Sequence, residues 1–299
     1  MDEIIYSYNN NNTTYCKIKV GQHTYTIEGY SRAGYMTSIG IKELNTLFDM
    51  GCSKLYYYDN KLISHGHMDH IGALHTDHSS RRFFNIMNEK LYIMPTQCII
   101  PFKVIAGAFS EMNSGKSLKN NINLVNTNII ESESCNEYIK LIGTSYYVKA
   151  FEMDHKIKSF GYIIYLKSKK LKKEYIGMDG NMIKKIRMEI GVENLTDECY
   201  SPLVGYTGDT SIKGLLINRE FLDVPLLIME CTGFSDEDIT TTREGKHIHW
   251  NDIIENKEKF NNMKIILFHF SQKYKTYEDL IEYIGNMDSS FFDKLLFFL

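Results

Sequence analysis

Two stretches near the start of the chain, residues 16–20 and 24–28, alternate apolar and polar positions. A period of two is typical of β-strands that have one buried face and one face in water. The polar residues 7–14 beside them indicate a hairpin or loop, and residues 39–48 indicate a strand that ends in a turn at Asp49. The beginning of the chain therefore predicts strands rather than helices.

The later chain repeats one arrangement, in which an apolar run ends just before a polar side chain. A short run over residues 62–64 leads into a histidine-rich loop. Four further runs have this form: residues 146–151 before His155, residues 202–206 before Asp209, residues 226–229 before Glu230, and residues 265–268 before His269. Because stiff strands hold such side chains at the edge of a sheet, the pattern predicts a sheet-based active site.

Helical spacing predicts helices over residues 72–84, 250–260 and 277–287. The apolar tail, residues 291–299, contains Asp293 and Lys294, and we expect it to form a packed terminal helix rather than a membrane anchor. Strands and helices are interleaved, and we find neither an internal repeat nor a long linker. We therefore expect a single α/β domain over residues 1–299.

The composition limits the classes of function. The 299 residues are 43% apolar, enough for a sizeable core, and the formal net charge of −3 excludes a chain that is basic throughout. The six cysteines are scattered without a C-x-x-C pair, which argues against a structural zinc knuckle or a disulfide framework and favours a reducing compartment. Since neither a signal peptide nor a bilayer-spanning run is evident, we expect an intracellular protein, cytoplasmic or nuclear, that is neither secreted nor bound to a membrane.

Residues 64–70, Ser-His-Gly-His-Met-Asp-His, form the densest cluster of potential metal ligands. His65 and His67 alternate, so both imidazoles can reach one ion, whereas Asp69 and His70 must point elsewhere, towards a second ion. Imidazole nitrogens and carboxylate oxygens with few thiolates suit a catalytic zinc site that keeps an open position. The alternative is a polar loop with accidental histidines, and the specific spacing H-x-H-x-D-H argues against it.

His155, Asp209 and His269 can complete the coordination of two ions. We expect one zinc on His65, His67 and His155, the other on Asp69, His70 and His269, and Asp209 between them. A bridging carboxylate lowers the repulsion between cations about 3.5–4 Å apart, and such a pair can supply a hydroxide at neutral pH. Each residue also has an ordinary alternative, since a lone histidine after a strand is usually structural and Asp209 could cap a turn. We expect His75 and His78 to be surface residues.

The net charge hides a basic segment at about residues 156–187. It contains ten lysines and arginines against Glu174 and Asp179, a net +8 in 32 residues, so the rest of the chain carries −11. Such a run is often only a solvated face, but beside a metal site it would bind RNA phosphates without regard to sequence. We expect RNA contacts from Lys169, Lys170, Lys172, Lys173, Lys184 and Lys185.

Several short blocks around these candidates match one known family. They are residues 28–34 (Glu-Gly-Tyr-Ser-Arg-Ala-Gly), 48–51 (Phe-Asp-Met-Gly), 159–162, 172–177 with 180–185, 206–210, 229–232 and 268–274. With the histidine loop, His155 and His247, the chain resembles ribonuclease Z, the tRNA 3′-processing endonuclease, most closely its short eukaryotic form. The resemblance covers roughly residues 26–275, whereas residues 101–140 match poorly.

The resemblance implies a four-layer αβ/βα sandwich (the metallo-β-lactamase fold), two zinc ions per subunit, with manganese or iron as possible substitutes, and a homodimer. It implies an endoribonuclease that removes the 3′ trailer from precursor tRNA by cutting after the discriminator base. It also implies that Glu230 orients His247, that His247 protonates the leaving 3′-oxygen, and that Asp69 doubles as ligand and general base. In many members the insertion before Gly-Asp-Thr is a tRNA-binding arm.

The chain departs from the family pattern at two positions. Lys246 stands where the family commonly has glycine, and Lys273 stands where it commonly has arginine. Lys273 can still contact an RNA phosphate as a point charge, but it lacks the bidentate fork of arginine. The alternative enzyme is a metallo-β-lactamase-fold phosphodiesterase that acts on a small phosphodiester, and the non-enzymatic alternative is an RNA-binding protein with a decayed site.

Overall fold

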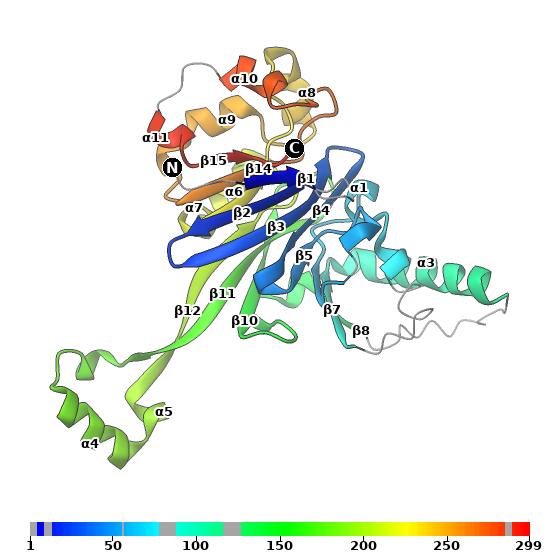
Figure 1. The fold of residues 1–299 in the computed structure, drawn as a ribbon. Helices are drawn as coiled ribbons and strands as arrows, with labels where there is room; N and C mark the ends of the chain where they lie inside the picture. The colour runs from blue at the N-terminus through cyan, green and yellow to red at the C-terminus, as the bar shows by residue number, and fades with distance from the viewer. Residues whose placement is uncertain (1–4, 9–13, 56, 78–87, 116–126, 285–288) are drawn as a thin grey trace.

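Two β-sheets pack face to face, and helices cover their outer faces (Figure 1). The computed structural model describes residues 5–8, 14–55, 57–77, 88–115, 127–284 and 289–299. Within these residues, no helix combines the length and the apolar character needed to cross a bilayer.

The first sheet contains strands β1 to β8 in chain order. Their bounds are β1 Ile5–Tyr8, β2 Thr14–Val20, β3 His23–Arg32, β4 Met36–Ile41, β5 Thr46–Phe48, β6 Asn60–Leu62, β7 Lys90–Met94 and β8 Thr127–Glu131. The helices of this half are α1 Met68–Ile71 and α3 Thr96–Ser114, with 3-10 turns η1 Lys42–Leu44, η2 Ser53–Leu55 and η3 Ser132–Ser134. Strands β1 to β5 pair antiparallel and β5 to β8 pair parallel, so the histidine loop after β6 leaves the carboxyl edge of parallel strands.

The second sheet has the strand order β15-β14-β13-β12-β11-β10-β9. The strands are β9 Ile139–Lys140, β10 Tyr146–Met153, β11 Ser159–Leu171, β12 Thr196–Tyr206, β13 Leu226–Glu230, β14 Lys264–Phe268 and β15 Leu295–Phe297. The helices are α4 Gly180–Ile190, α5 Val192–Leu195, α6 Ile212–Ile217, α7 Glu220–Asp223, α8 Ile239–Glu244, α9 Trp250–Glu255, α10 Glu278–Ile284 and α11 Ser289–Phe292, with 3-10 turns η4 Lys173–Tyr175, η5 Asp236–Asp238 and η6 Lys257–Lys259. Strands β12 to β15 pair parallel, so their carboxyl ends share one edge.

Among the described residues, three apolar cores hold the layers together. The central core lies between the sheets and takes residues from both, such as Ile39 of β4 and Val204 of β12. A second core packs the outer face of the second sheet, including Leu227, against helical residues such as Trp250. A third core packs the outer face of the first sheet against Phe102 of α3. The succession helix, sheet, sheet, helix confirms the α/β prediction of a four-layer αβ/βα sandwich.

The strands predicted at the start of the chain are confirmed, because residues 16–20 and 24–28 lie in β2 and β3. The single strand predicted over residues 39–48 is wrong. A 3-10 turn separates β4 from β5, and it ends at Asn45, whose φ of 47° is left-handed. Asparagine tolerates that conformation better than most residues, which is why the chain can reverse there.

The polar hairpin and the predicted helices fall partly outside the described residues. Strands β1 and β2 pair antiparallel up to Tyr8 and Thr14, while residues 9–13 lie outside the description. Residues 250–260 form α9 and η6, as predicted, and α10 occupies most of the helix predicted over residues 277–287. Of the helix predicted over residues 72–84, residues 74–77 are helical and residues 78–84 are not described, so His78 is not placed; residues 285–287 are not described either.

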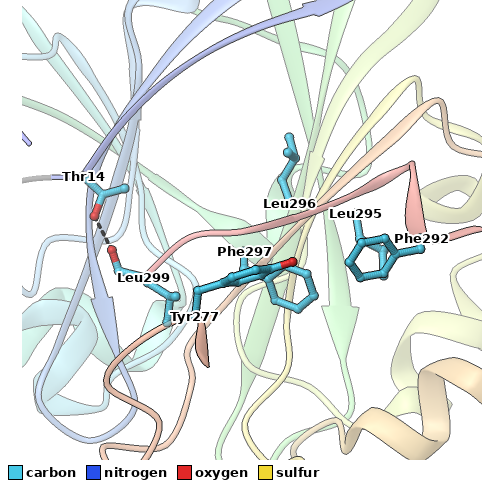
Figure 2. Close-up of a pocket in the computed structure, with 7 residues that line it drawn as sticks. All are labelled: Thr14, Tyr277, Phe292, Leu295, Leu296, Phe297 and Leu299. Atoms are coloured by element: carbon cyan, nitrogen blue, oxygen red, sulfur yellow. Dashed lines mark hydrogen bonds between the residues drawn. The ribbon is translucent and has the colours of Figure 1, made fainter. Parts of the chain in front are cut away.

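The terminal helix predicted over residues 291–299 is wrong, because the tail ends in strand β15. Leu296 and Phe298 face the central core, whereas Leu295 and Phe297 face the outer core. This alternation between two apolar environments has the period of a strand, and β15 accordingly pairs parallel with β14. The strand also lines an apolar pocket of about 480 Å³ (Figure 2).

A long arm projects from the body of the molecule (Figure 1). It consists of the outer halves of β11 and β12, which pair antiparallel through residues 165–171 and 196–202, and of α4 and α5 at its tip. Between residues 166 and 202 only Leu195 is buried. The basic segment of the sequence is therefore held away from the apolar cores.

Candidate functional site

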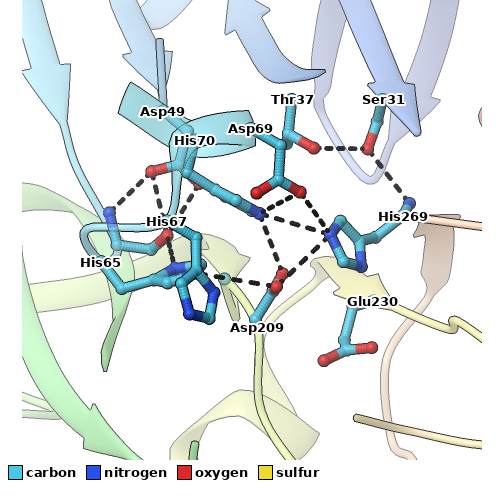
Figure 3. Close-up of polar contacts among 12 residues, drawn as sticks. Ser31, Thr37, Asp49, His65, His67, Asp69, His70, Asp209, Glu230 and His269 are labelled. Atoms are coloured by element: carbon cyan, nitrogen blue, oxygen red, sulfur yellow. Dashed lines mark hydrogen bonds and ion pairs between the residues drawn. The ribbon is translucent and has the colours of Figure 1, made fainter. Parts of the chain in front are cut away.

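The polar side chains predicted at strand ends come together in one cluster, to which both sheets contribute (Figure 3). The histidine loop comes from the first sheet, directly after β6. The other contributions come from the second sheet: His155 follows β10, Asp209 follows β12, Glu230 ends β13 and His269 follows β14. Because the strands are buried and hydrogen-bonded, they hold these side chains in place, while His67, Asp69 and His247 stay partly exposed.

The first group of donor atoms belongs to His65, His67, His155 and Asp209, which lie within 4.8 Å of one another. His65 Nε2 lies 3.0 Å from His67 Nδ1, and His155 Nε2 lies 3.4 Å from the same Nδ1. His65 Nε2 is 3.7 Å from the Asp209 carboxylate. These are the three histidines that the sequence assigned to one ion.

The second group contains Asp69, His70 and His269. The Nε2 atoms of His70 and His269 lie 3.3 Å apart. Asp69 Oδ2 is 3.5 Å from the first and 3.3 Å from the second. Asp209 is 3.3 Å from both Nε2 atoms, one through each carboxylate oxygen, so it lies between the two groups as the sequence predicted.

The spacing of these atoms fits divalent metal ions. Tetrahedral zinc–nitrogen bonds of about 2.1 Å place neighbouring ligand atoms about 3.4 Å apart, which is the separation seen in both groups. Asp209 is 1% exposed, and its Oδ1 receives no hydrogen bond. A buried carboxylate oxygen without a donor, facing imidazole nitrogens, is what a cation would satisfy. Imidazole and carboxylate donors suit zinc and similar ions.

The tautomers of the histidines support the same conclusion. A carbonyl or a carboxylate can only accept, so Nδ1–H of His155 donates to the Lys246 carbonyl at 3.3 Å and Nδ1–H of His70 donates to Asp49 at 2.7 Å. The Ser64 hydroxyl donates to Asp49 and therefore accepts from Nδ1 of His65 at 3.0 Å. In each ring Nε2 is the nitrogen left facing the donor clusters, as in metal-binding histidines.

Asp49 is the hub of the site, that is, the residue that accepts hydrogen bonds from several of its side chains. The sequence analysis did not identify it. It is fully buried and accepts hydrogen bonds from the backbone and hydroxyl of Ser64, from His70, and from the Tyr206 hydroxyl at 2.5 Å. Tyr206 in turn stacks between Phe48 and Phe268, which anchors the hub in the central core. Asp49 follows the apolar strand β5, so the strand-end rule that found the other candidates could have found it.

The electric field at the centre favours positive charge. Burial lowers the pKa of His70, but the neighbouring carboxylates Asp209 and Asp49 raise it well above its usual range. Burial raises the pKa of Asp209, yet His269 and His70 hold it well below the usual range. For His65, burial lowers the pKa further than Asp209 raises it, which keeps that imidazole neutral and able to act as a ligand.

Glu230 and His247 form a second unit beside the donor clusters. Glu230 is fully buried and accepts four hydrogen bonds, from Thr210 N, Thr232 Oγ1, Ile248 N and Nδ1 of His247 at 3.0 Å. Burial lowers the pKa of His247, but the Glu230 carboxylate outweighs burial and raises it to about 9. The histidine therefore carries a proton at neutral pH, as the family resemblance implied for an acid.

Residues other than glycine that have a left-handed backbone conformation are concentrated at this site. Among the described residues that are not glycine, φ is positive at Asn45, Asp49, Lys246 and His269, and the last three belong to the site or contact it. The Gly-Asp-Thr turn also needs its glycine, because Gly208 has φ of 60° and a Cβ there would lie 2.5 Å from Ser64. Such strain persists only where surrounding contacts determine the backbone, as they do here.

The predicted RNA-binding lysines fall into two environments. On the arm, Lys169, Lys170, Lys173, Lys184 and Lys185 are exposed and Lys172 is half-exposed, and within the described residues none of them has a carboxylate within 4.0 Å. Lys273 lies instead on the loop after His269, where its Nζ is 2.6 Å from Asp238 and 2.8 Å from the Ser235 hydroxyl. The arm therefore offers unpaired positive charge, whereas Lys273 is already engaged.

Comparisons with known proteins give both a family and a fold. No protein-family model matches the chain. The chain is 36% identical over 265 residues to tRNase Z TRZ1 of Arabidopsis thaliana, covering 86% of this chain and 90% of that protein. The crystal structure of the human tRNase Z short form superposes with a TM-score of 0.51 at 16% identity, covering 82% of this chain and 92% of that one. The metallo-β-lactamase fold protein YhfI from Bacillus subtilis gives a TM-score of 0.55 at 15% identity over 89% and 92%.

Proposed function

The chain belongs to the tRNase Z family of metal-dependent endoribonucleases, which remove the 3′ trailer of precursor tRNA, and we propose that it makes this cut with the two donor clusters and the Glu230–His247 pair. One observation carries the proposal: two groups of potential metal donors meet at Asp209 and lie directly beside His247, whose Nδ1 is 3.0 Å from the Glu230 carboxylate. Phosphodiester cleavage needs both, because charge develops on the phosphoryl oxygens and the leaving oxygen needs a proton.

We propose that two zinc ions occupy the centre. One would be held by His65, His67 and His155, the other by Asp69, His70 and His269, with Asp209 between. Bound there, the ions would polarise a phosphoryl oxygen and lower the pKa of water. Manganese and iron accept the same donors, so metal analysis of the protein purified without added metal is the test. Two equivalents of zinc per chain support the proposal, and less than one equivalent of any transition metal rejects it.

His247 is the proposed acid. Its Nδ1 is bound to Glu230, so Nε2 is the nitrogen that can donate to the 3′-oxygen as the phosphorus–oxygen bond breaks. The tRNA then leaves with a 3′-hydroxyl, and the phosphate stays on the trailer. Glu230 keeps the imidazole oriented and charged, and four donors keep Glu230 itself in place.

Asp69 is the proposed base. Burial raises the pKa of this carboxyl group, but His269 and His70 outweigh burial and hold it below the usual range, so the group is ionised. Its Oδ2 also accepts a hydrogen bond from Gly34 N at 2.8 Å, which fixes the carboxylate at the rim of the centre. From there it would orient the attacking water and take its proton.

The arm is the proposed RNA-binding element. Lysines 169 and 170 lie on β11, whereas lysines 172, 173, 184 and 185 lie beyond the strand, the last two on α4. Strands β11 and β12 stay paired from the body into the arm, with one register shift between Ile164 and Tyr165, so we treat body and arm as one domain. Unpaired lysines on an extended support suit contacts with the phosphate backbone of a folded RNA, which depend on shape more than on base sequence. Lys273 is a further proposed phosphate contact, weakened by its bond to Asp238.

Helix α3 supports the proposal that two copies of the chain associate. Ile100, Val104 and Met112 are 66%, 55% and 70% exposed and lie at helical spacing along one side of α3. An apolar stripe of this kind is typical of an interface. Light scattering should give the mass of a dimer, and Val104→Glu should give a monomer. A wild-type protein that is monomeric at all concentrations would reject the dimer.

We propose that the protein is intracellular, in the cytoplasm or the nucleus. The six cysteines are free thiols, five of them buried. A reducing compartment keeps such thiols in this state.

Cleavage of a precursor tRNA that carries a trailer tests the proposed function directly. The pure protein should cut next to the discriminator base, and a chelator should abolish the cut. The absence of a metal-dependent cut at this position would reject the assignment. Hydrolysis of a small phosphodiester without tRNA cleavage would point instead to the alternative phosphodiesterase.

A further inference from the structure

Lys246 occupies a backbone conformation that its side chain disfavours. It directly precedes the proposed acid His247, and its φ is 58°, in the left-handed region. A residue with a Cβ is uncommon there and persists only when other contacts hold it. The question is therefore which contacts hold Lys246 and what they achieve.

Both the side chain and the backbone of Lys246 bind the loop that follows β10. Its Nζ lies 2.7 Å from Asp154 Oδ1 and donates to the His155 carbonyl at 3.3 Å. In the opposite direction, the Lys246 carbonyl accepts from Nδ1 of His155 at 3.3 Å. The loop that carries the acid is thus fastened to the loop that carries a proposed metal ligand.

Asp154 extends this connection to a third loop. Its Oδ2 accepts from the Ser211 hydroxyl at 2.6 Å, and its carbonyl accepts from Ser211 N at 2.9 Å. Ser211 follows Asp209 by two residues. One short chain of contacts, from Lys246 through Asp154 to Ser211, therefore joins the loops that carry the acid, a histidine ligand and the bridging carboxylate.

We propose that Lys246 is a positioning residue, whose ion pair with Asp154 holds the His247 loop at the distance from the metal-ligand loops that proton transfer to the leaving oxygen requires. The proposal rests on the function proposed above, since it presupposes that His247 protonates an alkoxide. It assigns Lys246 no contact with RNA, because its ammonium group is already bound by Asp154 and by the His155 carbonyl.

Two substrates separate this role from its alternatives. A precursor tRNA has an alkoxide leaving group that needs the acid, whereas bis(4-nitrophenyl) phosphate has a stabilised phenolate that leaves without one. In Lys246→Ala and in Asp154→Asn, kcat on precursor tRNA should fall about two- to five-fold, the range that a partly exposed ion pair supports. KM for tRNA should stay constant, and hydrolysis of the small diester should change far less than cleavage of tRNA.

The two side chains should also act as one unit. The double variant Lys246→Ala/Asp154→Asn should lose no more activity than either single variant, because breaking the pair once removes its whole effect. Lys246→Gly should lose kcat to the same extent while unfolding at a higher temperature than Lys246→Ala, since glycine accepts the left-handed backbone. Lys213→Ala is the matched control, because Lys213 is an exposed cation that also acts electrostatically on Asp154.

Four results would overturn the proposal. Equal losses on both substrates would indicate an effect on the whole centre, and a rise in KM with kcat unchanged would indicate a phosphate contact. A Lys246→Gly variant with full wild-type kcat would show that only the backbone matters, and additive losses would show that the pair is not coupled. A wild-type protein that leaves precursor tRNA uncut would instead reject the proposed function.

Discussion

Polar side chains are buried at the centre of this protein, whereas they are exposed on its arm. At the centre, Asp49, Asp209 and Glu230 are buried, and Asp49 and Glu230 each accept several hydrogen bonds. On the arm, Lys184 and Lys185 are exposed and have no carboxylate partner within the described residues. The centre is held by many contacts that leave little freedom, whereas the arm carries charge with almost no packing.

The difference matches what we propose that each region binds. A metal centre needs donor atoms fixed to within a fraction of an ångström, and only a connected network in a buried environment fixes them. A polyanion is recognised by charge density along its backbone, which needs exposure and tolerates motion. Substitutions should therefore abolish function sharply at the centre and reduce it gradually on the arm.

The largest effect is expected at Asp209. In Asp209→Asn the carboxylate between the two donor groups is lost, so bound metal should fall to one equivalent or less. Cleavage of precursor tRNA should fall on the order of 10³-fold, by analogy with the loss of a group that acts only in the transition state. Metal analysis and single-turnover cleavage check this, and two tightly bound ions in the variant would contradict the assignment of Asp209.

A large effect is also expected at Asp49, although it contacts no proposed substrate or metal. Asp49→Asn keeps the size and tolerates φ of 56°, but it weakens the acceptor that orients His70 and Ser64. Metal affinity should fall about 10- to 100-fold, as for other groups that orient metal ligands. Competition with a chelator measures this, and an unchanged affinity would show that the hub is only structural.

A change in pH dependence is expected at Glu230. The carboxylate raises the pKa of His247 to about 9, so the acid is protonated below that pH and loses its proton above it. In the wild type, kcat/KM on precursor tRNA should fall as the pH rises past about 9. Glu230→Gln removes the larger of the two carboxylate charges that oppose burial, leaves only that of Asp209, and should move this decline to a lower pH.

Profiles measured on precursor tRNA test the Glu230 prediction. Because the acid is needed only for the alkoxide, the decline should be absent with bis(4-nitrophenyl) phosphate. A decline that stays near pH 9 in Glu230→Gln would separate His247 from the observed titration.

A moderate effect is expected from the arm. Lys184→Gln with Lys185→Gln should raise KM for precursor tRNA and reduce the slope of log affinity against log salt by about one to two. The control is Lys17→Gln with Lys19→Gln, which removes two exposed lysines from β2. An equal change of slope in both variants would show that the arm has no special part in RNA binding.

The smallest effect is expected at Lys273. Its Nζ lies 2.6 Å from Asp238, so the charge is already partly neutralised. Lys273→Met should change the slope of log affinity against log salt by less than about one. This change should be smaller than the change caused by replacing any single arm lysine. A larger change would show that RNA displaces Asp238 from Lys273.

Much of the site could be predicted from the sequence because ligands cluster at strand ends. His65, His67, Asp69 and His70 are close in sequence, and the later candidates each follow an apolar run, so spacing alone predicted which side chains meet. The structure brings the side chains of each predicted group close together.

The parts of the fold and of the site that the sequence did not predict depend on contacts between segments that are distant in the sequence. Asp49 touches Tyr206 from the other sheet, and the Lys246–Asp154 pair joins residues 92 positions apart, so local spacing carries no sign of either. The apolar residues of the tail, residues 291–299, fit the period of a helix as well as that of a strand. The sequence analysis therefore could not separate the two and predicted a helix. Only the presence of two cores, one on each side of β15, decides in favour of a strand. Residues 78–84 lie outside the described structure, so that part of the prediction stays open.

The proposal that the centre cleaves the phosphodiester and that the arm binds RNA is tested most directly by two variants on two substrates. Asp69→Ala should lose cleavage of both precursor tRNA and bis(4-nitrophenyl) phosphate while binding tRNA nearly as well as the wild type. The variant with Lys169, Lys170, Lys172 and Lys173 changed to glutamine should lose tRNA cleavage but keep hydrolysis of the small diester. Equal losses of the two activities in the lysine variant, or loss of tRNA binding in Asp69→Ala, would contradict the account.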